Sequence, residues 1–201
     1  MIGPGAKSDL VHDLQAGRDA LLWKLEGLSE YDARRPMTPT GTNLLGLVKH
    51  VAYVELGYFG AVFGRPVPEA QPWIDDDGSE PNWDLWATAE ESREHLVGTY
   101  RAAWEHADAT IDALALDAAG EVSWWRPERR VVTLHQILVH VIAETHRHAG
   151  HADIVRELID GAAGLRDGNA NLPDSGGAWW DSSRRRVETA AREASGGPSR
   201  L

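Results

Sequence analysis

The chain has no cysteine among its 201 residues. This absence excludes disulfide bonds, thiolate metal ligands, iron–sulfur clusters and a cysteine nucleophile. Any metal site must therefore be built from histidine, aspartate and glutamate. Any thiol chemistry requires a thiol that a small molecule brings to the protein.

Positive charge and long apolar runs are also scarce. The formal net charge is −11, which argues against the phosphate backbone of a nucleic acid as a partner. No apolar run is long enough to span a bilayer, so we expect no membrane partner. The first residues, MIGPGAKSD, lack a basic region followed by an apolar core. We therefore expect no secretory signal and a cytoplasmic location.

Four amphipathic segments predict long helices, and no run of residues shows the alternation typical of strands. The segments cover about residues 6–27, 43–63, 88–114 and 133–161. Thr40 or Thr42 can cap the second helix, and capping boxes begin the third helix at Thr88 and the fourth at Thr133. The sequence therefore predicts an all-α fold.

The connections between these helices are unequal in length. A long, acidic, proline-bearing connection, residues 65–87, joins the second helix to the third. Four long helices with one long crossover are typical of a four-helix bundle, which we expect in residues 1–165. The composition then changes to glycine, asparagine, aspartate and serine. We expect residues 166–201 to form a C-terminal extension, with a short basic helix at 182–194 and a disordered end.

Apolar side chains repeat at three- and four-residue spacing along the fourth helix, which marks its buried face. They are Leu134, Ile137, Val141, Val155 and Leu158. Glu144, His148 and His151 take the missing positions of this series. A carboxylate and imidazoles on a buried face are costly unless they are paired or bind a cation. Because residues four apart lie one turn above each other, Glu144 and His148 can bind one ion.

His50 interrupts an apolar stripe of the second helix in the same way, between Leu47 and Val54. Taken alone, it is best explained as a core histidine hydrogen-bonded to a neighbour. Taken with Glu144 and His148 on another helix, it is the third metal ligand. Two nitrogens and one carboxylate with open positions fit Zn²⁺ first, and also Ni²⁺ or Fe²⁺.

His151 and His140 border the same face of the fourth helix. His151 can be a ligand in place of Glu144, a group that orients a ligand, or a catalytic base above the metal. His140 lies one turn before Glu144 and has the same alternatives. Surface or structural roles are favoured for the histidines that have no partner in the sequence, which are His12, His95, His106 and His135.

Two segments carry a resemblance to a known family: TNLLGLVKHV at residues 42–51 and ETHRHAGHADI at residues 144–154. They resemble the DinB-like superfamily of metal-binding four-helix bundles. More narrowly, they resemble the branch with mycothiol-dependent maleylpyruvate isomerase and the mycothiol S-transferases. The resemblance covers about residues 6–162. Members place one ligand on the second helix and two, four residues apart, on the fourth.

The resemblance therefore implies His50, Glu144 and His148 as metal ligands. Many relatives have histidine where Glu144 stands, whereas the isomerase has glutamate there. Many relatives have glutamine at the position of His151, so the resemblance does not imply His151 as a ligand.

The resemblance also implies a reaction between a low-molecular-weight thiol, such as mycothiol, and an electrophilic substrate. The thiol binds the metal through sulfur, the metal lowers the pKa of the thiol, and the thiolate attacks the electrophile. The sequence shows no clear set of residues that recognises mycothiol. Arg126 and Arg147 are candidates for binding it, and Arg129 and Arg130 can also bind a carboxylate or a sugar.

Seven of the nine tryptophans lie in or beside loops. They can line an apolar pocket over the metal, or pack loops and a dimer interface. With the resemblance, they predict a homodimer. The seven are Trp73, Trp83, Trp86, Trp124, Trp125, Trp179 and Trp180.

Three functions are compatible with these features. The leading one is a metal-dependent thiol S-transferase or thiol-dependent isomerase. The second is a metal-dependent hydrolase that uses metal-bound water, with Glu144 or His151 as base. The third is a non-catalytic stress-response or metabolite-binding protein whose metal is structural. Dependence on a thiol separates the first two, and a saturated four-ligand site favours the third.

Overall fold

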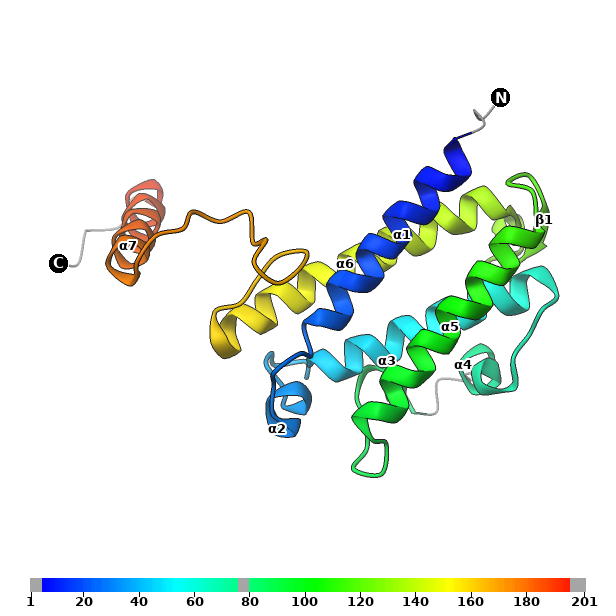
Figure 1. The fold of residues 1–201 in the computed structure, drawn as a ribbon, viewed down its shortest axis with the longest axis horizontal. Coiled ribbons are helices and arrows are strands. Elements are labelled where there is room, and N and C mark those ends of the chain that lie inside the picture. Colours follow the sequence, from blue (N-terminus) through cyan, green and yellow to red (C-terminus); the bar gives the residue numbers. More distant parts are fainter. Residues whose placement is uncertain (1–4, 76–79, 196–201) are drawn as a thin grey trace. The chain divides into compact units, whose positions relative to one another are not determined.

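The computed structural model describes residues 5–75 and 80–195, and within them the protein is mostly helical, as predicted for an all-α chain. Figure 1 shows the order of the helices, which are α1 Ala6–Trp23, α2 Glu30–Arg34, α3 Leu44–Glu55, α4 Gln71–Ile74, α5 Arg93–Ala113, α6 Leu134–Asp160 and α7 Gly177–Ala194. The chain forms two compact units, Met1–Ala170 and Asn171–Leu201. Among the described residues, no helix combines the length and the apolar character needed to cross a membrane.

The long helices begin and end close to the predicted residues, with local corrections. The first helix stops at Trp23, and the chain turns through Gly27 with a positive φ of 71°. Asn43, rather than Thr40 or Thr42, caps α3, because its side-chain oxygen accepts a hydrogen bond from the Gly46 amide at 2.8 Å. After Glu55 the helix continues as a π-helical turn, Leu56–Gly60, and a 3₁₀ turn, Ala61–Phe63.

The predicted start of the third long helix was wrong. Ser92 caps α5 by accepting a hydrogen bond from the His95 amide. The expected capping box at Thr88 forms only in part, since Glu91 accepts a hydrogen bond from the Thr88 amide but also pairs with Lys49. Glu91 therefore stabilises a turn that precedes α5 and does not cap the helix. By contrast, the capping box at Thr133 is complete, as predicted for α6.

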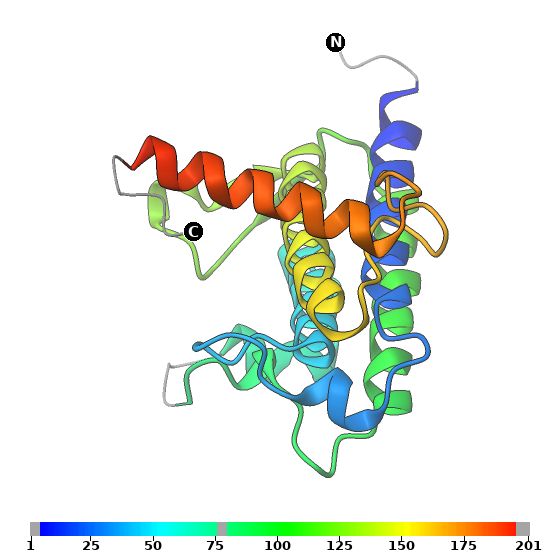
Figure 2. The ribbon, with the colours of Figure 1, turned by 90° about the vertical axis from the view of Figure 1, so that its left-hand side faces the viewer.

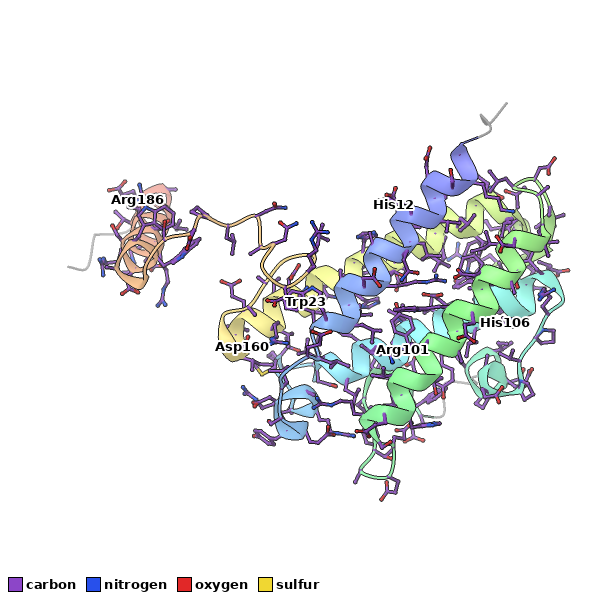
Figure 3. The ribbon with its side chains drawn as sticks, viewed as in Figure 1. His12, Trp23, Arg101, His106, Asp160 and Arg186 are labelled. Carbon is purple, nitrogen blue, oxygen red and sulfur yellow. The ribbon has the colours of Figure 1, made fainter. Side chains whose placement is uncertain are left out.

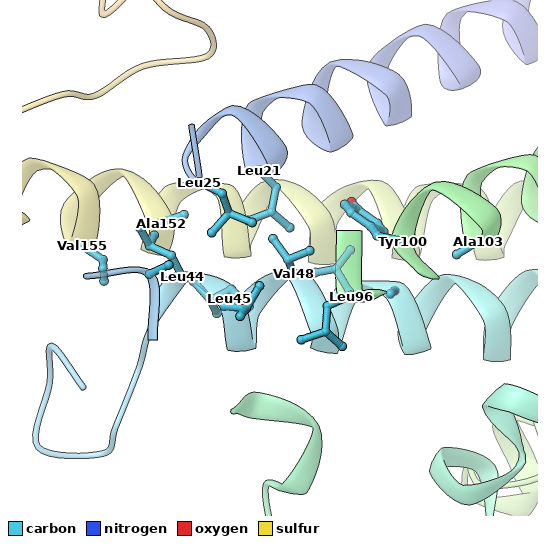
Figure 4. Packing of buried hydrophobic residues seen from close by; sticks show 14 of the residues in the cluster. Leu21, Leu25, Leu44, Leu45, Val48, Leu96, Tyr100, Ala103, Ala152 and Val155 are labelled. Carbon is cyan, nitrogen blue, oxygen red and sulfur yellow. The ribbon is translucent and has the colours of Figure 1, made fainter. Parts of the chain in front are cut away.

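Four helices enclose the core of the first unit. Helix α1 packs along α6, and α3 packs against both α5 and α6 (Figure 1). Figure 2 shows α1 and α5 on one side of the α3–α6 pair. Apolar side chains from all four helices meet in one cluster (Figure 4), where burial of each leucine contributes about 1.5–3 kcal/mol to stability. The cluster includes Leu21, Leu25, Leu44, Leu45, Val48, Leu96, Tyr100, Ala103, Ala152 and Val155.

A buried ion pair crosses this interior. Arg18 of α1 and Glu55 of α3 are both fully buried, and Nη2 of Arg18 lies 2.6 Å from Oε2 of Glu55. Nη1 of Arg18 donates a second hydrogen bond to Asp108 of α5 at 2.9 Å. Because a buried charge without its partner is strongly destabilising, this network favours one arrangement of the three helices.

A small hairpin, absent from the sequence prediction, precedes α6. Strand β1, Ala119–Glu121, pairs antiparallel with β2, Val131–Thr133, with Gly120 opposite Val132. A Cβ atom at Gly120 would lie within 2.8 Å of Val62 and Phe63, so glycine allows the hairpin to pack on the end of the second long helix. The hairpin holds the intervening loop, residues 122–130, beside α6.

The second unit contains α7. This helix begins at Gly177, five residues before the predicted start, and ends at Ala194 as predicted. The predicted disordered end falls almost entirely on residues 196–201, which lie outside the described residues. Leu158, which the sequence pattern placed on the buried face of α6 in the first unit, is 63% exposed, whereas Val155 and Ile159 on either side of it pack in or against the core.

Candidate metal centre

The structure brings together His50 of α3 with Glu144 and His148 of α6. Nε2 of His148 lies 2.9 Å from Oε1 of Glu144, and Nε2 of His50 lies 3.6 Å from the same oxygen. One possible ligand atom from each residue falls within 4.8 Å of the others, and no other such group occurs in the described part of the chain. The three side chains therefore face one common space, as the sequence predicted.

The antiparallel packing of α3 and α6 explains this convergence. The rings of His50 and His148 are 4.7 Å apart, and so are the rings of Tyr58 and His140. From His50 to Tyr58 the chain advances eight residues through α3 and its π-helical continuation, and from His148 to His140 it goes back eight residues along α6. Helical periodicity then keeps one face of α3 against one face of α6 over more than two turns, with Glu144 between the two contacts.

The centre lies at the edge of the core, and its side chains are between 11% and 26% exposed. Burial raises the pKa of the Glu144 carboxyl, but hydrogen bonding and charge from His148 and His50 outweigh it, so this pKa lies below its usual range. Burial, together with the charge of His50, lowers the pKa of His148. At neutral pH the centre therefore offers an ionised carboxylate and an unprotonated imidazole.

Asp84, which the sequence prediction missed, contacts His50 of this centre. Nδ1 of His50 donates a hydrogen bond to Oδ2 of Asp84 at 2.8 Å. An imidazole that donates through Nδ1 keeps a lone pair on Nε2, the atom that faces Glu144. Burial raises the pKa of the Asp84 carboxyl, but hydrogen bonding and charge from His50 bring it below its usual range. By contrast, Nδ1 of His148 is buried and has no hydrogen-bond partner among the described residues.

The segment that carries Asp84 is fixed by residues of α3. Nζ of Lys49, a nearly buried lysine, donates to the carbonyl oxygens of Trp83 and Trp86, each at 3.1 Å. Gly46 lies directly beneath the carbonyl of Leu85, where any side chain would overlap that oxygen. The residues next to His50 in the sequence thus place the carboxylate that orients it.

Aromatic side chains form a wall beside the centre. Tyr58 lies in the π-helical turn after α3, where its hydroxyl accepts a hydrogen bond from Nε1 of Trp125 at 3.0 Å. Trp73 donates through Nε1 to Oδ2 of Asp84 at 3.0 Å, which connects the wall to His50. A Cβ atom at Gly57 would lie 2.5 Å from the Trp73 ring, so only glycine allows this approach.

The donor set fits a divalent metal ion. Ligands bound tetrahedrally to zinc at 2.0–2.2 Å are about 3.4 Å apart. The separations of Glu144 from His148 and His50, 2.9 and 3.6 Å, bracket this value, and all three ligand atoms lie within 4.8 Å of one another. Two imidazole nitrogens and one carboxylate oxygen are ligands that Zn²⁺, Ni²⁺ and Fe²⁺ accept. Asp84 adds the carboxylate–histidine pair that commonly supports a metal-binding imidazole.

The other predicted site residues are not part of the group of possible ligands. The His151 ring is 5.3 Å from that of His148, outside the group of possible ligands. Arg126 lines a pocket with Trp124 and Trp125. Arg147 is exposed on α6.

The sequence contains no direct indication of Asp84, whereas Trp73 is one of the seven tryptophans expected either to line a pocket over the metal or to pack loops and a dimer interface. Asp84 and Trp73 lie in the long connection between the second and third long helices, which carries no helical periodicity. The tryptophans beside Asp84 were the only sequence signal that this segment contacts the site.

Comparison with known proteins agrees with this geometry. No curated protein matches the chain. The model of one family, described as mycothiol-S-transferase, matches residues 9–161, a range that contains α1, α3, α5 and α6 apart from three residues at the start of α1. This match covers most of the chain, including all three side chains of the centre. The chain therefore belongs to the mycothiol-S-transferase family.

Proposed function

We propose that this protein is a metal-dependent thiol S-transferase or thiol-dependent isomerase that uses a low-molecular-weight thiol such as mycothiol. The observation that supports it is the convergence of His50, Glu144 and His148 across α3 and α6, in a chain of the mycothiol-S-transferase family. The proposal includes the fold, in which α1, α3, α5 and α6 form a four-helix bundle of DinB-like type. Such bundles build metal sites from inward-facing side chains of neighbouring helices.

The proposed ligands are Nε2 of His50, Nε2 of His148 and a carboxylate oxygen of Glu144. Zn²⁺ is the metal we expect, with Ni²⁺ and Fe²⁺ as alternatives. A bound ion would supply a Lewis acid with a free coordination position, which would lower the pKa of a thiol that coordinates there. Three protein ligands leave such a position, whereas a structural site is closed by four.

The protein residues orient the reactants and move the proton. Asp84 holds His50 in the tautomer that leaves Nε2 unprotonated. His151, whose ring contacts that of His148, is the proposed base that accepts the proton of the thiol. Arg147 is proposed to help bind the thiol from the exposed side of α6.

The test is conjugation of mycothiol to monochlorobimane by the metal-loaded protein, with glutathione and bacillithiol in parallel. We expect conjugation that depends on both metal and thiol, and that is lost in His148→Ala. His12→Ala is the matched control, because His12 is an exposed histidine on α1 (Figure 3). Metal-dependent hydrolysis of an ester or amide, without conjugation of any thiol, would favour the hydrolase instead.

Two expectations from the sequence accompany this proposal. We propose a homodimer, and light scattering at micromolar concentration should give twice the mass of one chain, 22.1 kDa. A monomer mass would contradict it. We also propose that the protein acts in the cytoplasm, where low-molecular-weight thiols are kept reduced.

A further inference from the structure

A pocket of about 410 Å³ opens beside the metal centre, in the first compact unit. It is lined by Trp124, Trp125, Arg126, Arg129 and His140. A second hollow of about 550 Å³ shares Trp125, Arg129 and His140 with it. The three shared side chains make the two hollows parts of one recess between the hairpin loop and α6.

The recess is adjacent to the proposed metal ligands. His140 lies four residues before Glu144 on α6, which places it one turn, about 6 Å, from that ligand along the helix axis. Tyr58 contacts His140 and Trp125 with ring separations of 4.7 and 5.9 Å. A molecule in the recess is therefore within reach of a group held at the centre.

Two kinds of side chain line the pocket. Trp124, Trp125 and His140 present flat rings, which bind planar apolar groups by stacking and edge contacts. Arg126 and Arg129 are exposed at its rim, and neither forms an ion pair within the described residues. The guanidinium of Arg129 lies 5.7 Å from the centre of the Trp125 ring, so a positive charge borders an aromatic face.

The charge of these arginines contrasts with the rest of the protein. The chain carries a net charge of −11, and yet two guanidinium groups that pair with no carboxylate in the described part of the chain border one pocket. Glu128 lines the second hollow but pairs with neither arginine. Arginine binds carboxylates through two parallel hydrogen bonds, so this rim favours a carboxylate at the mouth of an aromatic pocket.

We propose that this pocket binds the electrophilic substrate, and that this substrate is a planar aromatic compound bearing a carboxylate. The inference rests on the proposed function and names the substrate class for it. The rings of Trp124, Trp125 and His140 hold the planar part beside Glu144. Arg126 and Arg129 bind the carboxylate. Arg126 is therefore assigned to the electrophile, and not to the thiol as the sequence suggested.

Equilibrium binding tests the inference without any turnover. The probes are 3-nitrobenzoate and its uncharged counterpart 3-nitrobenzamide, titrated calorimetrically into the full-length, zinc-loaded protein. We expect the carboxylate to bind about tenfold more tightly or better, since hydrogen bonds to charged groups contribute that much. The double variant Arg126→Gln/Arg129→Gln should lose this preference and still bind both probes weakly through the rings.

Arg101→Gln is the matched control, because Arg101 is an exposed arginine on α5 (Figure 3) that lines none of these walls. It should keep the preference for the carboxylate. A further arm repeats the titrations on zinc-free protein, since a carboxylate can also coordinate the metal directly. A preference that persists without zinc and disappears in the double variant supports the inference.

Equal binding of the two probes would overturn it. A preference that survives in the double variant, or one that vanishes when zinc is removed, would overturn it too. These outcomes are independent of the proposed function. Arginine-dependent binding without thiol conjugation would contradict the transferase alone, and conjugation without arginine-dependent binding would contradict this inference alone.

Discussion

Asp84 accepts a hydrogen bond from Nδ1 of His50 at 2.8 Å, and this bond joins the long connection between α3 and α5 to the proposed metal centre. Asp84→Ala removes the group that fixes the tautomer and the ring orientation of His50. We expect the affinity for zinc to fall about 10- to 100-fold, as it does when the hydrogen-bonding partners of metal-bound histidines are removed. Competition with a chelator measures this change.

Asp112→Ala is the control for this variant, because Asp112 is an exposed aspartate on α5. It should leave zinc affinity unchanged. An unchanged affinity in Asp84→Ala would show that packing alone orients His50.

The three proposed ligands should differ in how far their loss weakens the site. His148→Ala and His50→Ala leave two protein ligands, and we expect the purified variants to retain no zinc. Glu144→Gln should weaken binding less, because its carbonyl oxygen can still coordinate. Metal analysis after dialysis gives the occupancy, with His12→Ala as the control. Full occupancy in His148→Ala would contradict the ligand set.

Gly46 provides a test of how the fold positions the site. Glycine in a helix is normally less favourable than alanine by about 1 kcal/mol. At Gly46, however, a methyl group would overlap the carbonyl oxygen of Leu85. We expect Gly46→Ala to lower the free energy of unfolding by about 1–3 kcal/mol. Zinc affinity should fall as well, because the segment next to Leu85 carries Asp84.

Gly98→Ala is the matched control, since a Cβ atom there meets no atom of the described residues within 4 Å. This substitution in α5 should be neutral or stabilising in the same urea titration. If Gly46→Ala stabilised the protein as Gly98→Ala does, Leu85 could move away from residue 46 at no cost, and the prediction would be wrong.

The convergence of the three proposed ligands could be predicted because helical periodicity fixes which side of each helix they are on. His50, Glu144 and His148 each interrupt an apolar stripe, and a stripe on a long helix faces the core. When two such helices pack against each other, the polar residues that interrupt their apolar stripes lie between the same two helices. The same periodicity predicted the extent of α6, whose complete capping box at Thr133 is a local signal.

Asp84 could not be predicted in this way. Its position depends on contacts with residues far away in sequence, which are the ammonium of Lys49 and the bare backbone of Gly46. Neither contact leaves a periodic pattern. The start of α5 was mispredicted for a related reason, since Glu91 satisfies the Thr88 amide but is held in a turn by its pairing with Lys49.

The pairing of Lys49 with Glu91 should make the stability of the Asp84 segment depend on pH. The ammonium lies 2.9 Å from the carboxylate. Burial raises the pKa of Glu91, but Lys49 and the Thr88 amide outweigh it, so this pKa lies below its ordinary value of 4.5. A lowered pKa in the folded state means that the pair stabilises the protein fully above about pH 4.5 and that this contribution is lost as the pH falls further.

We therefore expect Glu91→Gln to lower the free energy of unfolding by about 1–2 kcal/mol at pH 7, between the values for exposed and buried charged pairs. At pH 3 the two proteins should differ less, because protonation of Glu91 then competes with its pairing to Lys49. Urea unfolding at the two pH values measures the difference. Glu90→Gln, a change at the exposed neighbouring residue, should have little effect at either pH. An equal loss from Glu91→Gln at pH 7 and pH 3 would show that its charge does not hold this segment on α3.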